Sequence, residues 1–155
     1  MPYREVAGLL TDLGTEEMAH FEMVATIVHQ LTRNLTPEEI KDSSFGPYYI
    51  DHTLGIWPQA AGGIPFNACE FQVKGDPVTD LVEDMAAEQK ARSTYDNILR
   101  VVKDPDVADP IRFLRAREVV HFQRFGEALT LVQEKLNSKN FYACNPSIDK
   151  NCSNC

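Results

Sequence analysis

The sequence predicts an all-α protein, because three long segments carry apolar residues at the spacing of packed helices. The segments cover residues 3–33, 78–103 and 110–136, and in each the inward positions advance in alternating steps of three and four residues. With 155 residues and 43% hydrophobic content, the chain is long enough to bury the core of one domain. We expect this domain to occupy residues 1–136, followed by a polar, cysteine-containing tail over residues 137–155.

The first predicted helix carries two polar residues, Glu17 and His20, on its inward stripe. The other positions of the stripe are aliphatic: Val6, Leu10, Leu13, Val24, Ile27 and Leu31. Burying a carboxylate and an imidazole among such side chains costs roughly several kcal/mol unless a partner binds them. A metal ion is one such partner, and a buried Glu–His ion pair is the alternative. The same stripe leaves Glu16 and Glu22 in solvent and turns His29 away from the site.

Residues 34–77 form a long connection between the first two long helices. The pair Thr36-Pro37 is a helix-start signal, so a short helix is expected near residues 37–42. Residues 46–66 contain glycine, proline and aromatic residues without a regular period, and a connection of this length is usually functional or packs on a partner. We expect the aromatic side chains to cover the bundle or a neighbouring subunit, and His52 to be an ordinary loop histidine.

The second long helix, opened by Asp76 and Pro77, places Glu88 on its inward stripe. The neighbouring positions of the stripe are mostly apolar: Val78, Leu81, Met85, Tyr95, Leu99 and Val102. Arg92 lies one turn after Glu88. Its guanidinium can offset negative charge at an inward site, or it can extend outward to solvent.

The third long helix is predicted to start with Asp109 as N-cap and Pro110 at its first position. Glu118 and His121 replace apolar residues near the middle of its stripe. The remaining positions of the stripe are Ile111, Leu114, Phe125, Ala128 and Val132. Antiparallel packing of the three stripes would therefore bring all of the inward polar residues to one level.

Glu17 with His20, and Glu118 with His121, are two copies of one motif, Glu-x-x-His. Residues three apart share one face of a helix, so each pair can bind one metal ion. Glu occupies 12 of the 155 positions, so chance places it three residues before a given His roughly one time in twelve. Two of the four histidines, His20 and His121, have a Glu three residues before them. Two such motifs, with a Glu from each of two further helices, are typical of ferritin-like di-iron and dimanganese carboxylate proteins, so we predict a ferritin-like four-helix bundle with Glu88 as the third contribution.

Three long helices supply only three of the four contributions and leave one side of a four-helix core uncovered. The chain also starts abruptly, with Pro2 at the beginning of a helix. We therefore expect the first helix of the bundle, with its Glu, to be missing. The uncovered core predicts an exposed apolar groove and self-association.

Composition excludes several classes of partner. The formal charge of −8 and the pI of about 4.9 leave no basic stripe for a nucleic acid. No run of about 18 apolar residues is present, so no membrane span is expected, and the first residues lack the apolar segment of a secretory signal. A cytoplasmic location follows as the default.

The cysteines do not form a recognisable metal site. Cys69 lies alone, whereas Cys144, Cys152 and Cys155 fall within the last twelve residues. A terminal Cys-x-x-Cys can bind zinc or cross-link chains, but no second ligand pair is spaced to complete a zinc site. A loose tail with reducible thiols is therefore the favoured interpretation.

Four blocks of sequence resemble the manganese catalases and the related spore-coat proteins of the CotJC type. They are LTDLGTEEMAHFEM at residues 10–23, AAGGIPF at 60–66, AAEQKAR at 86–92 and RAREVVHFQRF at 115–125. The resemblance extends from residue 1 to about residue 136 and leaves the cysteine tail outside.

The resemblance implies a dinuclear manganese site and a role for each inward polar residue. Glu17 matches the Glu that bridges the two metals and His20 its histidine, while Glu88 and His121 match the ligands of the second metal. Glu118 matches a carboxylate kept beside the metals as an outer-sphere proton carrier, which makes it the candidate catalytic residue. The implied reaction is the disproportionation of hydrogen peroxide by a homo-oligomer, a hexamer in this family. Carboxylate and imidazole ligands suit iron as well as manganese.

Three other interpretations stay open. The first is a spore-coat structural protein with little or no turnover, which the cysteine tail favours. The second is a ferritin-like iron oxidase or store, which a metal-binding Glu118 would favour. The third is a bundle whose carboxylates merely pair with Arg92 and the histidines, which failure to retain metal would favour.

Overall fold

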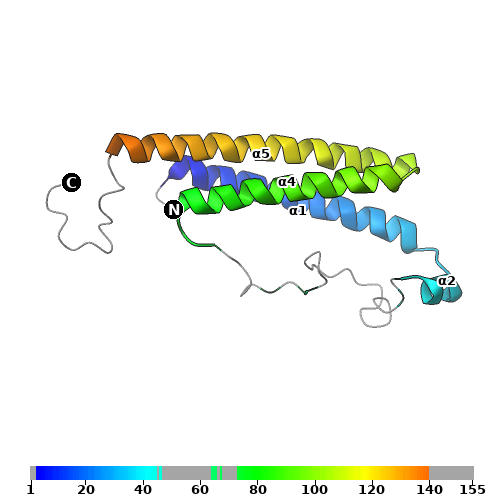
Figure 1. Cartoon of the computed structure of the whole chain (residues 1–155). Helices are drawn as coiled ribbons and strands as arrows, with labels where there is room; N and C mark the ends of the chain where they lie inside the picture. Colours follow the sequence, from blue (N-terminus) through cyan, green and yellow to red (C-terminus); the bar gives the residue numbers. More distant parts are fainter. Residues whose placement is uncertain (1–2, 45, 47–63, 66, 68–72, 140–155) are drawn as a thin grey trace. The chain divides into compact units, whose positions relative to one another are not determined.

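The computed structural model describes residues 3–44, 46, 64–65, 67 and 73–139, and the described chain is helical, as predicted. Within these residues three long helices and one short helix follow in order, with bounds α1 Arg4–Thr32, α2 Pro37–Asp42, α4 Pro77–Val101 and α5 Pro105–Lys139 (Figure 1). Among these described residues no helix has both the length and the apolarity to cross a bilayer. The aromatic connection around His52 and the four cysteines lie outside the described residues.

The chain divides into two compact units. The first unit combines residues 1–17, and thus the first half of α1, with residues 73–155. The second unit is residues 18–72 and contains the rest of α1 and the short helix α2. Helix α2 starts where the sequence predicts, because Thr36 and Glu39 form a reciprocal capping box.

The N-terminus of helix α4 is capped by a side chain. The Asp76 carboxylate accepts a hydrogen bond of 2.7 Å from the Thr79 backbone N–H, and Pro77 occupies the first turn. Gly75 has a φ of 78°, which glycine adopts without a steric penalty. The Asp80 carboxylate accepts from the N–H groups of Lys74 and Gly75 and fixes this approach.

Helix α5 begins five residues earlier than the sequence predicts, so the prediction of Pro110 as the first position is wrong. Asp104, rather than Asp109, caps the helix, because its carboxylate accepts from the Asp106 N–H and its carbonyl accepts from the Ala108 N–H. Asp104-Pro105 and Asp109-Pro110 are the same local signal, and the first of the two starts the helix. Pro110 is consequently inside α5.

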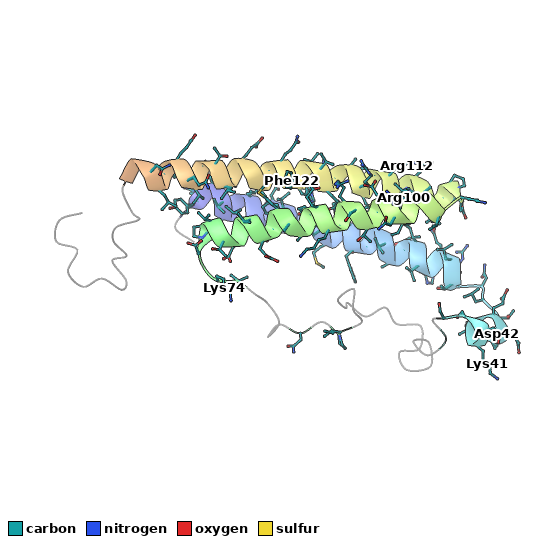
Figure 2. All side chains as sticks on the ribbon, viewed as in Figure 1. Lys41, Asp42, Lys74, Arg100, Arg112 and Phe122 are labelled. Atoms are coloured by element: carbon teal, nitrogen blue, oxygen red, sulfur yellow. The ribbon has the colours of Figure 1, made fainter. Side chains whose placement is uncertain are left out.

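Helices α4 and α5 lie side by side and run antiparallel, joined by residues 102–104 (Figure 1). Arg100 on α4 and Arg112 on α5 both lie toward the connected end (Figure 2). Near this end Arg115 of α5 donates a hydrogen bond of 2.5 Å to the Asp96 carboxylate of α4. The short connection between the two helices accounts for the antiparallel packing.

The core of the first unit joins α4 and α5 to the first half of α1. Its buried members come from all three helices: Val6, Leu13, Leu81, Phe125, Ala128 and Val132. All seven predicted inward positions of α5 are buried. In their middle Glu118 and His121 interrupt the apolar run, with Leu114 on one side and Phe125 on the other. A polar layer therefore crosses an otherwise apolar core.

Candidate metal centre

His121 of α5 is fully buried and lies at the centre of this polar layer. Its Nδ1 lies 2.7 Å from Oε1 of Glu17 on α1 and 3.7 Å from Oε1 of Glu88 on α4. Its Nε2 lies 2.9 Å from Oε2 of Glu16 on α1. Two neighbouring helices thus direct carboxylates at one imidazole ring.

Four of the five predicted site residues come together within the first unit. One donor atom each from Glu17, Glu88, Glu118 and His121 can be chosen so that all four lie within 4.8 Å of one another. Glu118 is 2% exposed and Glu88 is 9% exposed. The fifth residue, His20, is a buried residue of the second unit, one turn after Glu17 along the same helix.

The carboxylates of this cluster oppose one another's ionisation. Burial, a hydrogen bond with Glu118, and the charges of Glu118, Glu17 and Asp84 raise the pKa of Glu88 to about 9. The carboxylates of the cluster also affect Tyr95, two turns further along α4. Burial and the charges of Glu118, Glu17 and Glu88 raise the pKa of Tyr95 to about 12.

Glu17 is not buried as its place on the stripe predicts, because 46% of its side chain is exposed. Three and four residues after Leu13, helix geometry places Glu16 and Glu17 on opposite edges of the buried stripe. The two carboxylates therefore reach the His121 ring from different sides, one at each nitrogen.

The prediction that Glu16 is simply solvated is wrong. Its Oε2 accepts hydrogen bonds from Nη2 of Arg117 at 2.7 Å and from Nε at 3.2 Å. Hydrogen bonding to His121 and to Arg117 lowers the pKa of Glu16 to about 2. The prediction that Glu22 is solvated is confirmed, since its side chain is exposed, and His29 is exposed as well.

Glu16 belongs to a ladder of ion pairs between α1 and α5. The pairs are Glu5–Lys135 at 2.8 Å, Asp12–Arg124 at 2.6 Å and Glu16–Arg117 at 2.7 Å. The acidic members are spaced seven and four residues apart beside the apolar stripe, as charged positions flanking a packed helix face are. This charge pattern was the available sequence signal for Glu16.

Arg92 lies on the predicted stripe but does not neutralise the cluster through its hydrogen bonds. It donates to Gln89 at 2.8 Å and to Asp96 at 2.8 Å, both on its own helix. On α5, Arg117 instead binds Glu16, whose Oε2 also contacts His121.

The donor set fits a divalent transition metal. Three carboxylates and one imidazole gather at one level, all of them buried except Glu17, and burial together with the neighbouring Glu118 keeps Glu88 protonated to a pH of about 9. A bound cation would replace this proton and remove the repulsion. Oxygen and imidazole ligands of this kind suit manganese and iron.

Comparisons with known proteins agree with this chemistry. A sequence model of the family of manganese-containing catalases matches residues 2–142. The chain is 47% identical to protein CotJC of Bacillus subtilis (strain 168) over 138 residues, which cover 89% of this chain and 73% of that protein.

Two relatives with catalase names are more distant. The chain is 32% identical to the probable manganese catalase of Clostridium acetobutylicum over 133 residues, covering 86% of this chain and 59% of the relative. It is 31% identical to the manganese catalase of Lactiplantibacillus plantarum over 138 residues, covering 82% of this chain and 52% of the relative. The chain thus spans little more than half the length of these two catalases.

Proposed function

Because this chain belongs to the family of manganese-containing catalases, we propose that it holds two manganese ions and disproportionates hydrogen peroxide to oxygen and water. The observation that carries the proposal is the cluster of the exposed Glu17 with the buried Glu88, Glu118 and His121. Iron is the alternative metal, since the donor set accepts both.

The proposed ligands are Glu17, His20, Glu88 and His121. Glu17 and His20 share one face of α1, so one helix can present both to the same ion. Glu88 and His121 come from α4 and α5, and their contact of 3.7 Å supports a shared role. Glu17, which also contacts His121, is suited to join the two metal positions.

Glu118 is proposed to carry protons. Two molecules of peroxide give one O₂ and two waters, so oxidation of the first releases the two protons that reduction of the second consumes. Glu118 is buried beside Glu88, and the hydrogen bond between their carboxyl groups holds a proton next to the site. Leu114 and Phe125, one turn away on either side of the Glu118–His121 pair, exclude bulk water from that proton. When bound, a pair of manganese ions supplies one electron per metal for each two-electron exchange.

Oxygen evolution from hydrogen peroxide tests the proposal. The purified chain, loaded with Mn(II), should evolve oxygen at a rate well above that of the metal-free chain. Glu17→Ala should bring the rate down to that of the metal-free chain, whereas Glu22→Ala, an exposed position on the same helix, should not change it. A manganese-loaded chain that evolves no more oxygen than its metal-free form would contradict the proposal.

One observation favours an iron oxidase or store as a second candidate. A carboxylate oxygen of Glu118 lies within 4.8 Å of donor atoms of Glu17, Glu88 and His121, which suits direct binding of metal. Consumption of Fe(II) and oxygen by the iron-loaded chain, with no oxygen released from peroxide, would support this candidate.

The identity of 47% with protein CotJC favours a third candidate, a structural protein of the spore-coat type. This role predicts a chain that retains its fold with or without metal and shows no turnover of peroxide. A homo-oligomer in the cytoplasm or the spore coat is proposed for either role, on the family resemblance.

A further inference from the structure

Glu16 is held in place by two arginines that flank His121 on the same helix. Arg117 and Arg124 lie four residues before and three residues after His121, so all three share one face of α5. Arg117 donates two hydrogen bonds to Oε2 of Glu16, and Nη1 of Arg124 lies 3.7 Å from Oε1. The Glu16 side chain is 34% exposed and is thus fixed at the edge of the polar layer rather than extended into solvent.

The Glu16 carboxylate can only accept a hydrogen bond from His121. An arginine in a protein is always protonated, and Arg117 donates to the same Oε2 atom that faces the His121 ring. The contact of 2.9 Å between Oε2 and Nε2 is therefore an Nε2–H group donating to a carboxylate.

The opposite ring nitrogen faces the cluster. With its hydrogen on Nε2, a neutral imidazole carries its lone pair on Nδ1. This Nδ1 lies 2.7 Å from Oε1 of Glu17 and 3.7 Å from Oε1 of Glu88. The lone pair and the two carboxylates thus converge on a position that attracts a cation.

We propose that Glu16 is a positioning residue for His121: its carboxylate, clamped by Arg117, holds the ring proton on Nε2 and so presents Nδ1 to the Glu17–Glu88–Glu118 cluster. Carboxylate partners of metal-binding histidines fix the ring and its tautomer in this way. The consequence for metal binding rests on the proposed function, because it requires an ion at the cluster. The tautomer is a property of the chain and can be measured without any metal.

The tautomer of His121 tests the proposal directly. Nitrogen-15 spectra of the histidine rings are recorded for the metal-free full-length chain at alkaline pH, so that the spectra report neutral rings. The signals of His121 are assigned by their loss in His121→Gln. The wild-type ring should carry its hydrogen on Nε2, and a ring with its hydrogen on Nδ1 would overturn the proposal.

Glu16→Leu is the informative variant, because it keeps much of the size of the side chain but removes the Oε2 acceptor that faces both Nε2 and Arg117. Without an acceptor at Nε2, the ring hydrogen should move toward Nδ1, which lies 2.7 Å from Oε1 of Glu17, and Mn(II) affinity should fall by about 10- to 100-fold. Glu16→Gln should keep the hydrogen on Nε2, because Arg117 can hold its amide oxygen in the Oε2 position. Glu22→Leu, at an exposed position of α1, should alter neither.

Arg117→Gln provides a second variant that leaves the cluster and Glu16 unchanged in sequence. It removes the hydrogen bonds that hold Glu16, so the fraction of rings with the hydrogen on Nε2 and the Mn(II) affinity should both lie between those of the wild type and Glu16→Leu. A ring hydrogen that stays on Nε2 in Glu16→Leu would overturn the proposal. A tautomer that shifts as expected in a chain that binds no Mn(II) would uphold the positioning role and refute the proposed function instead.

Discussion

At the scale of single residues, Glu88 carries the largest electrostatic perturbation of the site. Its pKa of about 9 means that it is neutral in the folded, metal-free chain and ionised in the unfolded chain between pH of about 4.5 and 9. The folded state then binds one proton more than the unfolded state. Stability must therefore decrease as pH rises through this window, the reverse of the usual behaviour of a paired carboxylate.

We predict that the free energy of unfolding of the metal-free chain falls by at most about 1.4 kcal/mol per pH unit between pH 5 and pH 8, through Glu88. Glu16 does not obscure this slope, because its lowered pKa of about 2 makes its contribution vanish only as the pH falls below 4.5. Urea unfolding at several pH values measures the slope. It should be lost in Glu88→Gln, and an equal slope in that variant would contradict the assignment.

A substitution of Glu118 can show whether this residue carries protons or binds the metal. If it carries protons, Glu118→Gln should keep the wild-type manganese content while the rate of oxygen evolution falls by about 10²- to 10⁴-fold. Metal content and oxygen evolution measured on one preparation give the answer. Loss of metal in this variant would show that Glu118 binds the ion, as the iron-oxidase interpretation requires.

The site could be predicted from sequence where helical phase alone decides the position. Glu88, Glu118 and His121 lie at the centre of their stripes, and all three are buried as expected. Glu16 and Glu17 lie at the two edges of the stripe, where phase does not decide exposure. Their positions depend on Arg117 and His121, more than 100 residues further along the chain.

At the scale of elements, the bounds of α1, α2 and α4 agree with the sequence within two residues, because each has a single start or stop signal. The start of α5 was wrong because two Asp-Pro pairs lie five residues apart and either can cap a helix. The earlier start is favoured because it extends α5 by a turn that buries Ala108.

The extra turn leaves Pro110 inside α5, where it has no N–H to donate to the carbonyl four residues earlier. Pro110→Ala should therefore raise the free energy of unfolding by about 1–2 kcal/mol, after the entropy gained by the unfolded chain is subtracted. Denaturant unfolding measures the change. Pro105→Ala is the matched control, because a proline in the first turn costs no hydrogen bond, and this variant should be no more stable than the wild type. If α5 instead began at Pro110, Pro105→Ala would be more stable than Pro110→Ala.

At the scale of the whole molecule, α1 presents a second apolar side. Met18, Phe21, Val28 and Leu31 are between 42% and 65% exposed and fall within one side of the helix. Exposed apolar side chains grouped in this way favour association. Self-association stays a prediction, and the sequence could not say that α1 would carry this exposed surface.

We predict that the sedimentation coefficient of the purified chain rises with concentration and that Phe21→Lys shifts it toward the monomer value. Val82→Lys, at a position on α4 that is 50% exposed, should leave it unchanged. A chain that remains a monomer at all concentrations and binds no hydrophobic dye would contradict this prediction.

The central claim is that carboxylates and imidazoles from three helices of this all-α, ferritin-like protein form a manganese centre. Its most direct test is the number of manganese ions that each chain retains after equilibrium dialysis, measured by elemental analysis. The wild type and Glu22→Ala should each retain two ions, and Glu17→Ala should retain fewer. A wild-type chain that retains none, or a Glu17→Ala chain that retains as many as the wild type, would contradict the claim.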